Sequence, residues 1–278
     1  MSKVWFVTGS SRGLGRSFVE AALSRGDKVA ATARNTESLD ELVAAYGDAV
    51  LPLALDVTDR AAVFESVTRA KEHFGRLDVI VNNAGYGLLG AVEELSEREL
   101  RDQLETNLFG VVWVVQAALP HLREQGGGHI IQISSAGGLF AMPLGGGYHA
   151  SKWALEGLSE SLAQEVAAFG IKVTLVEPGS YATDGAAGAV HAQADPLYDG
   201  FRESFAAFAT TLDSGDPAAA GRALLKIVDV DNPPLRVFFG TQGHQMIPQI
   251  YADRLKTWAD WQDLSMEAHG HTPAAPAV

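Results

Sequence analysis

The chain has 278 residues, of which 47% are hydrophobic and 20% are charged, and its formal net charge is −13 at pH 7. This length and composition suit one large packed domain, and the acidic balance without a basic run argues against a nucleic-acid partner. The chain has no cysteine, which excludes disulfides, thiol nucleophiles and cysteine metal sites. We therefore expect a protein of a reducing compartment, the cytoplasm.

Neither end of the chain predicts a targeting or membrane segment. The apolar run at residues 1–8 is too short for a signal peptide before glycines interrupt it. No stretch is long and apolar enough to span a bilayer. Residues 271–278 are rich in Ala and Pro and predict a frayed end.

The first motif is a glycine-rich turn between a strand and a helix. Residues 3–7 predict a buried strand, and the turn that follows contains Gly9, Gly13 and Gly15, before apolar residues recur at helical spacing. Such a turn lets backbone approach a pyrophosphate at the N-terminus of a helix. The spacing is G-x-x-x-G-x-G rather than G-x-G-x-x-G, so an ordinary glycine turn is the alternative.

The second predicted strand, residues 28–33, indicates which dinucleotide binds. NAD sites usually carry an acid at the end of this strand, where this chain has Ala33 followed by Arg34, and no carboxylate before Glu37. Arg12 in the glycine turn adds a second guanidinium, and arginines bind a 2′-phosphate well. We therefore predict NADP, with NADPH preferred over NADH. The alternative is that both arginines are solvated surface residues.

The next predicted strands, residues 50–55 and 77–81, both end in polar residues. Asp56 could accept a hydrogen bond from an adenine or cap the following helix, although Thr58 and Asp59 can also do that. The second of these strands leads into residues 82–85, Asn-Asn-Ala-Gly, where a ligand could lie against the backbone.

A long helical pattern over residues 97–124 contains Asn107, which is mildly unfavourable inside a helix. Asn107 is either a buried amide with a local hydrogen bond or the mark of a catalytic kink that holds water. A strand at 129–134 and a loop at 135–147 with large apolar side chains follow. This loop predicts either a ligand wall or packing beneath the sheet.

Tyr148 and Lys152 lie four residues apart at the start of a predicted helix that runs to about residue 169. At this spacing both side chains lie on one face of the helix. An ammonium near a phenol favours the phenolate, so we expect Lys152 to lower the pKa of Tyr148 toward the range of a general acid–base. The alternative is an ordinary helix with an exposed lysine.

After a sixth strand at 171–176, closed by Pro178–Gly179, residues 180–216 predict no strand but a helix with an aromatic face. We expect one domain over residues 1–278, with a mobile substrate lid at about 185–232. A helix at 217–230, a strand at 235–239 and a C-terminal helical extension at about 243–268 complete the prediction.

In combination, these motifs resemble the short-chain dehydrogenase/reductase family. The match is dense over residues 3–184 and looser beyond, and the run Asn82–Gly87 looks most like the hydroxysteroid and retinol dehydrogenase branch. The resemblance implies an α/β Rossmann-like fold, a doubly wound sheet of about seven parallel strands with helices on both faces. It rests on the glycine turn, Asp56, Asn82–Gly85, Asn107, Ser135, Tyr148, Lys152, Pro178, Gly179 and Thr183.

The resemblance also implies residue roles. Tyr148 is the general acid–base, and Lys152 lowers its pKa and holds the nicotinamide ribose. Ser135, thirteen residues before Tyr148, binds the substrate oxygen, and Asn107 holds a water connected to Lys152. The cofactor contacts are expected from Gly9, Ser11, Arg12, Gly13, Leu14, Gly15, Arg34, Asp56, Val57, Asn83, Ala84, Gly85, Tyr148, Lys152, Pro178, Gly179 and Thr183.

These expectations describe an oxidoreductase that moves a hydride between NADP(H) and a lipophilic ketone, aldehyde or secondary alcohol. The alternatives are a dinucleotide-binding regulator without turnover and a nucleotide-sugar epimerase or dehydratase. No metal is expected, since the histidines show no ligand spacing. The resemblance implies a homodimer or tetramer through the helices near 100–122 and 148–169. Expected substrate walls are Tyr86, Leu88, Phe140, Met142, Leu144, Tyr181 and the aromatic residues between 195 and 210.

Overall fold

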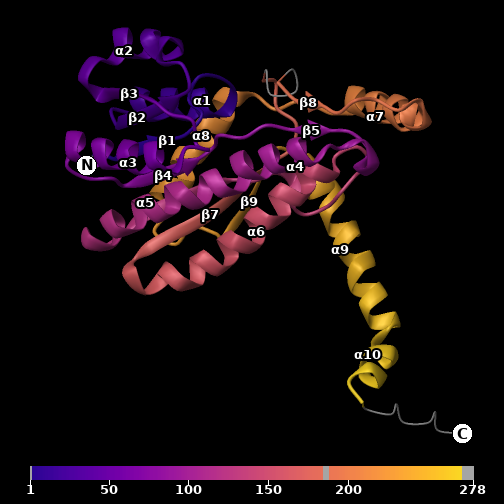
Figure 1. Ribbon diagram of the computed structural model, residues 1–278. Helices are drawn as coiled ribbons and strands as arrows, with labels where there is room; N and C mark the ends of the chain where they lie inside the picture. The colour runs from indigo at the N-terminus through magenta and orange to yellow at the C-terminus, as the bar shows by residue number, and fades with distance from the viewer. Residues whose placement is uncertain (1, 184–187, 271–278) are drawn as a thin grey trace, which may run out of the picture.

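The computed structural model describes residues 2–183 and 188–270 (Figure 1). Its centre is a seven-stranded sheet in the order β3-β2-β1-β4-β6-β7-β9, in which every neighbouring pair is parallel. The predicted fold class is therefore confirmed. The strands are β1 (Val4–Val7), β2 (Lys28–Ala33), β3 (Val50–Ala54), β4 (Val79–Asn82), β6 (Gly128–Ile133), β7 (Ile171–Pro178) and β9 (Arg236–Phe239).

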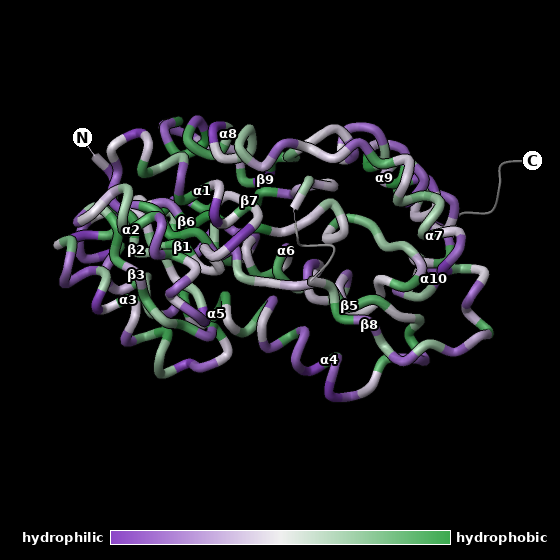
Figure 2. Tube along the Cα trace, turned by 90° about the horizontal axis from the view of Figure 1, so that it is seen from above, coloured by the Kyte–Doolittle hydropathy of each residue, from purple (hydrophilic) through white to green (hydrophobic). Residues whose placement is uncertain are grey.

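Helices cover both faces of this sheet, which is why its strands are apolar on both sides. One core lies between the sheet and α3, α5 and α6, and the other lies against α1, α2 and α8. In Figure 2 the central strands are mostly hydrophobic. The helices are α1 (Gly13–Ser24), α2 (Asp40–Tyr46), α3 (Arg60–Phe74), α5 (Gly110–Glu124), α6 (Gly146–Val166) and α8 (Pro217–Asp229).

The strand register brings distant motifs to one edge of the sheet. Val7 lies opposite both Ala31 and Val81, and Asn82 lies opposite Gln132. Because all strands run the same way, their carboxyl ends share this edge, where ligands bind in open α/β sheets. The glycine turn, the Asn-Asn-Ala-Gly segment and the loop after β6 therefore meet there.

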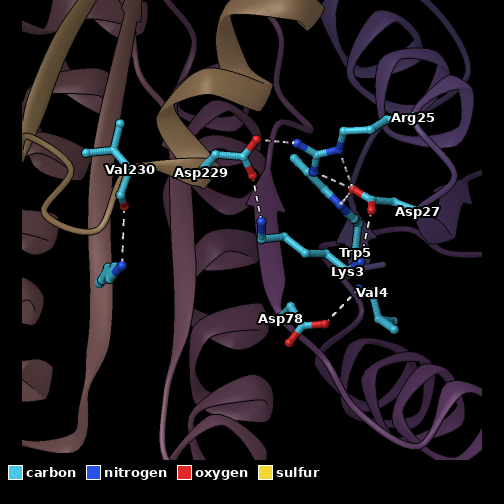
Figure 3. A network of polar contacts seen from close by, with 9 residues as sticks. Lys3, Val4, Trp5, Arg25, Asp27, Asp78, Asp229 and Val230 are labelled. Carbon is cyan, nitrogen blue, oxygen red and sulfur yellow. Dashed lines mark hydrogen bonds and ion pairs between the residues drawn. The ribbon is translucent and has the colours of Figure 1, made fainter. Parts of the chain in front are cut away.

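A polar network ties the chain together at the opposite edge (Figure 3). Asp27 accepts hydrogen bonds from the backbone N–H of Lys3 and from the indole of Trp5, each at 2.9 Å. Asp229, at the end of α8, pairs with Lys3 at 2.6 Å and with Arg25 at 2.8 Å. These contacts fasten the amino ends of β1 and β2 to α8, away from the ligand edge.

The long helix expected over residues 97–124 is interrupted. It consists of α4 (Glu97–Leu104), a π-helical turn at Glu105–Phe109 and α5. Asn107 lies in the π turn, a form of helix that is frequent at functional sites. A π turn therefore interrupts the helix at Asn107, and the catalytic, water-holding role weighed from the sequence stays a prediction.

The segment after β7 was predicted to hold no strand, and this is wrong. A two-residue strand β8 (Val190–His191) pairs in parallel with β5 (Leu88–Leu89), which follows the Asn-Asn-Ala-Gly segment. The strand was too short to give an alternating pattern. The predicted aromatic helix is present as α7 (Asp199–Thr211), and residues 184–187 of the expected lid lie outside the described residues.

The C-terminal extension is helical, with bounds close to those predicted. It consists of α9 (Gln242–Asp260) and α10 (Gln262–Ala268), which run away from the sheet in Figure 1. The first turns of α9 pack on the loop after β6 through Ile247. Farther along, the guanidinium of Arg254 lies 4.9 Å from the Trp153 ring of α6 and donates to the Leu139 carbonyl at 3.0 Å. No helix within residues 2–183 and 188–270 is long and apolar enough to cross a membrane.

Candidate active site

The glycine turn has the close backbone approach that a dinucleotide site needs. Gly9 and Gly13 adopt φ of +67° and +58°, values that favour glycine. A Cβ at Gly15 would lie 2.2 Å from the Gly9 carbonyl oxygen and 2.3 Å from Asn83 Nδ2. Asn83 Nδ2 donates to the carbonyls of Thr8 and Gly9 at 3.0 and 3.1 Å, so this amide fixes the turn from the neighbouring strand.

Thr8 was not among the predicted site residues, yet it joins the two segments. Its hydroxyl oxygen accepts from the backbone N–H groups of Asn83 and Ala84, at 2.9 and 3.0 Å. Its position directly before Gly9 was the available signal. Asn82 instead points into the sheet, where it donates to Gln132 at 2.9 Å.

One cavity of about 1180 Å³ runs from the glycine turn to the helical region beyond β7. This volume is larger than the upper range of about 1,000 Å³ for small-molecule sites and has room for a dinucleotide and a second ligand. All predicted catalytic and cofactor residues except Asn107 and Gly15 line it, together with four of the predicted substrate contacts. They are Gly9, Ser11, Arg12, Gly13, Leu14, Arg34, Asp56, Val57, Asn83, Ala84, Gly85, Tyr86, Ser135, Phe140, Met142, Tyr148, Lys152, Pro178, Gly179, Tyr181 and Thr183.

The end of the cavity near β2 carries positive charge. Arg12 and Arg34 line it and are exposed, and within the described part of the chain neither forms an ion pair with a carboxylate. Glu37, the first carboxylate after β2, accepts instead from the Asn35 side chain at 3.1 Å and does not line the cavity. This end can therefore hold an anion.

Asp56 does not cap α3. Asp59 does so by accepting from the Ala62 N–H at 3.0 Å. Asp56 accepts from the Thr58 N–H and hydroxyl at 3.0 and 2.8 Å, and it lines the cavity. Of the two roles weighed from the sequence, the cap is excluded and a cavity contact is available.

Tyr148, Ser135 and Lys152 meet in the middle of the cavity. Ser135 accepts from the Gly137 N–H at 3.0 Å, and its hydroxyl hydrogen-bonds to Tyr148. Lys152 Nζ lies 5.8 Å from the centre of the Tyr148 ring and donates to the Ile133 carbonyl at 2.8 Å. The sequence pair and the upstream serine therefore form one cluster at the end of β6.

The pKa values of this cluster differ from the expected ones. Burial raises the pKa of Tyr148, while the hydrogen bond from Ser135 acts in the opposite direction, so the expected lowering is not seen. Burial also lowers the pKa of Lys152 to about 8, and the Glu156 carboxylate opposes this change. At neutral pH, Tyr148 is therefore a protonated phenol that can donate.

Asn107 lies behind the cavity, between α6 and the Asn-Asn-Ala-Gly segment. Its Nδ2 donates to the Tyr86 carbonyl and to the Ser151 hydroxyl, each at 3.0 Å, and its Oδ1 accepts from the Tyr86 N–H at 3.1 Å. A Cβ at Gly85 would lie 3.0 Å from Asn107 Oδ1 and 3.8 Å from Lys152 Nζ. The amide thus fixes the backbone beside the lysine.

His149 is a further site residue that the sequence did not single out. The Met142 N–H donates to its Nε2 at 3.1 Å, which leaves Nδ1–H to donate to the Gly137 carbonyl at 2.8 Å. Burial lowers the pKa of His149, so the ring is neutral. It joins both ends of the loop that carries Phe140.

Apolar residues from several distant segments form the other end of the cavity. Phe205 and Phe208 of α7 line it, whereas Tyr198, Phe201, Leu88 and Leu144, also considered as walls, do not. The C-terminal extension contributes Gln242 and Met246, and Gln242 accepts from the Ser180 N–H. These two had no local signal, because they lie about sixty residues beyond the strand they contact.

No group of three or more metal-ligating side chains that could hold an ion occurs among the residues that the structure describes. The arrangement is a dinucleotide-sized cavity that joins an anion-accepting end, a Tyr–Ser–Lys cluster and an apolar end.

Comparison with known proteins identifies relatives of this chain. The family model for short chain dehydrogenases matches residues 3–194. Oxidoreductase BOA17 of Botryotinia fuckeliana is 42% identical over 273 residues, covering 96% of this chain and 99% of its own. The 3-ketodihydrosphingosine reductase of Bacteroides thetaiotaomicron is 34% identical over 262 residues, covering 92% and 93%.

Solved structures of short-chain dehydrogenases have a similar fold. A short-chain dehydrogenase from Streptomyces avermitilis is 40% identical with a TM-score of 0.91, covering 96% of this chain and 98% of its own. A short chain dehydrogenase from Burkholderia cenocepacia in complex with NADP is 28% identical with a TM-score of 0.75, covering 93% and 97%. The first of these likenesses extends over most of the C-terminal extension.

Proposed function

This chain belongs to the short-chain dehydrogenase family, and from that premise we propose that it is an NADPH-dependent reductase of lipophilic ketones or aldehydes. The observation that carries the proposal is the single cavity in which the Tyr148 and Ser135 pair lies between the dinucleotide turn and an apolar end. The chain is an oxidoreductase that binds a nicotinamide dinucleotide. Direction, cofactor preference and substrate are the proposed parts.

The proposed chemistry divides between cofactor and protein. The bound nicotinamide supplies the hydride. Ser135 donates a hydrogen bond to the substrate carbonyl oxygen and stabilises the negative charge that develops there. Tyr148 gives its phenolic proton to that oxygen, and the Lys152 ammonium stabilises the phenolate that remains. A raised pKa keeps Tyr148 protonated at neutral pH, which favours the reductive direction.

The NADPH preference rests on the two arginines at the β2 end of the cavity. Arg12 and Arg34 have no carboxylate partner in the described chain, and Glu37 is engaged by Asn35. A guanidinium binds a phosphate through two parallel hydrogen bonds. A 2′-phosphate would therefore find two free cations, whereas a bare ribose diol would lack the usual acidic partner.

The lipophilic substrate rests on the side chains at the far end of the cavity. Phe140, Met142, Phe205, Phe208 and Met246 present rings, thioethers and no charge. A relative that covers nearly the whole chain is named a 3-ketodihydrosphingosine reductase, which agrees with a carbonyl on a lipophilic body. We propose that Tyr86 and Tyr181 also contact the substrate and that residues 185–232 act as its lid.

We also propose an oligomeric state and a cellular location for the protein. Large apolar side chains on α5, α6 and the π turn are partly exposed, among them Phe109 and Trp153 at 39% and 41%. These are the helices through which the chain is expected to form a homodimer or tetramer. The absence of cysteine suits the cytoplasm.

The test is a titration of the purified protein with NADPH and with NADH, followed by nicotinamide fluorescence and then a carbonyl screen. We expect tighter NADPH binding, and loss of this preference in Arg12→Ala and Arg34→Ala. Arg16→Ala is the matched control, because Arg16 lies in the same helix start but pairs with Glu20 at 2.6 Å. Equal or tighter binding of NADH would contradict the preference, and binding without any turnover would favour a dinucleotide sensor.

A further inference from the structure

A cluster of buried charge lies directly behind the Tyr–Ser–Lys site. Glu156 is one helical turn after Lys152 on α6, and the two residues are only 5% and 6% exposed. Residues four apart on a helix share a face, so the two side chains lie on the same buried side of α6. Burying an unpaired carboxylate costs free energy, so we expect Glu156 to have a charged partner.

The pairing comes from a different strand. Arg236, at the start of β9, donates from Nε to Glu156 Oε2 at 3.0 Å and from Nη2 to Glu160 at 2.8 Å. The same Nε lies 3.7 Å from Glu177 Oε1 on β7. One arginine therefore serves three carboxylates, and it fixes one oxygen of Glu156.

The other oxygen of Glu156 lies near Gly138 and Ser134. Within the described residues, Oε1 is buried without a hydrogen bond that meets ordinary geometric limits. A Cβ at Gly138 would lie 3.3 Å from this atom and 2.8 Å from Ser134 Oγ, which places Glu156 beneath the loop that carries Ser135. This oxygen therefore lies on the side of Ser134, the residue before Ser135.

We propose that Glu156, anchored by Arg236, is a positioning residue that keeps the Lys152 ammonium charged behind Tyr148. The inference rests on the proposed function, because it gives Glu156 a part in the same reaction. Among the described residues, the Lys152 ammonium donates to the Ile133 carbonyl and forms no ion pair with a carboxylate, so Glu156 would act on it through space from the same buried face of α6.

The titration of Lys152 supports this reading. Its pKa falls to about 8 through burial, and Glu156 is the group that opposes the fall. Burial raises the pKa of both Glu156 and Glu177, the latter to about 8, so Glu177 carries a proton at neutral pH, while the Arg236 guanidinium favours the charged form of Glu156. Other groups face the Lys152 and Glu156 pair from the elements packed around it, namely Tyr148 and Glu160 of α6, Ser134 after β6, Glu177 of β7 and Arg236 of β9. Two more carboxylates, Asp102 of α4 and Glu105 of the π turn, line the cavity.

The experiment compares Glu156→Gln with Glu160→Gln. Both substitutions remove one carboxylate that Arg236 binds, but the Glu160 side chain is 55% exposed and does not act on Lys152. NMR of protein labelled at lysine Cε follows the Lys152 titration, assigned with Lys152→Arg. We expect the midpoint to move down by about one pH unit in Glu156→Gln and to stay in Glu160→Gln.

Activity gives the second readout. The alkaline limb of kcat/KM should move with the Lys152 midpoint in Glu156→Gln, and Glu156→Asp should restore much of it. If Glu156→Gln fails to fold, the double variant Glu156→Gln/Arg236→Gln compared with Arg236→Gln alone measures the same shift. An unmoved midpoint, or an equal shift in Glu160→Gln, would overturn the inference. Because the NMR midpoint needs no substrate, a wild type without turnover would count against the proposed function and not against this electrostatic coupling.

Discussion

At the scale of single residues, the site combines two opposite changes in ionisation. Burial raises the pKa of the Tyr148 phenol and lowers that of the Lys152 ammonium to about 8. The two groups therefore move apart in proton affinity, because the buried phenol holds its proton more tightly than a free tyrosine and the buried ammonium holds its proton less tightly than a free lysine. In the proposed reduction, the Tyr148 phenolate that remains would therefore take up a new proton readily.

The first prediction concerns Tyr148→Phe, which removes the proton donor but keeps the ring. We expect kcat for carbonyl reduction to fall by about 10²–10⁴, the usual contribution of a positioned acid, while the Kd for NADPH stays unchanged. Tyr86→Phe is the matched control, since it removes a phenol from the same cavity wall. Steady-state kinetics and fluorescence titration measure the two effects, and an active Tyr148→Phe enzyme would mean that another group is the acid.

Local patterns allowed the central residues to be predicted from sequence. Tyr148 and Lys152 are one turn apart on a helix, and the glycine turn follows its strand directly, so spacing alone was informative. Arg236 and Glu156 are eighty residues apart, and only the pairing of β7 with β9 brings them together. The pKa of Tyr148 was misjudged for the same reason, because burial depends on loops and helices that the spacing does not describe.

At the scale of elements, the glycine turn shows how closely two strands' ends must approach. The turn after β1 contacts the segment after β4 without space for a methyl group. The π turn between α4 and α5 serves the same purpose on the other side, because it turns the Asn107 amide toward the Tyr86 backbone. The sequence predicted one helical pattern over residues 97–124 because the apolar residues keep their spacing of three and four through the π turn, and only Asn107 suggested a kink.

The second prediction compares two glycine-to-alanine substitutions. Gly15→Ala forces a Cβ to within 2.2 Å of a backbone oxygen, so we expect a loss of about 3 kcal/mol in the free energy of unfolding. Gly157→Ala, in the exposed interior of α6, meets no atom within 4 Å and should gain about 0.5–1 kcal/mol. Urea unfolding measures both, and NADPH binding should weaken only in Gly15→Ala. Equal effects of the two changes would show that the turn can relax.

At the scale of the whole molecule, the parallel sheet has the cavity at one edge and a polar network that stabilises the fold at the opposite edge. Its carboxyl edge carries the cavity, whereas its amino edge carries the network of Lys3, Arg25, Asp27 and Asp229. Between the two lies the buried cluster of Glu156, Glu177 and Arg236, whose ionisation is linked to folding.

The third prediction is a pH dependence of stability. The folded pKa of Glu177 is raised to about 8, so the folded state binds a proton that the unfolded state has already lost. Its contribution is fully present below the unfolded value of about 4.3 and is lost as pH rises to about 8. Glu177→Gln, which mimics the protonated acid, should therefore exceed wild type in stability by about 2–4 kcal/mol at pH 8.

Urea unfolding of both proteins at pH 5 and pH 8 measures this effect, and the gain from Glu177→Gln should be much smaller at pH 5. Lys152, whose pKa is lowered to about 8, acts in a separate window, where stability recovers between about 8 and 10.4. Glu160→Gln is the control for an exposed carboxylate. The same gain at both pH values would show that Glu177 is ionised in the folded protein.

The C-terminal arm of α9 and α10 also determines what the protein's own fluorescence reports. Of the five tryptophans, only Trp5 is wholly buried, whereas Trp258 and Trp261 on the arm are 68% and 61% exposed. Trp153 lies on α6 beneath the Arg254 guanidinium of α9. Because the Arg254 guanidinium covers its indole, we expect the emission of Trp153 to change if the arm moves away from α6, whereas the buried Trp5 reports on the core.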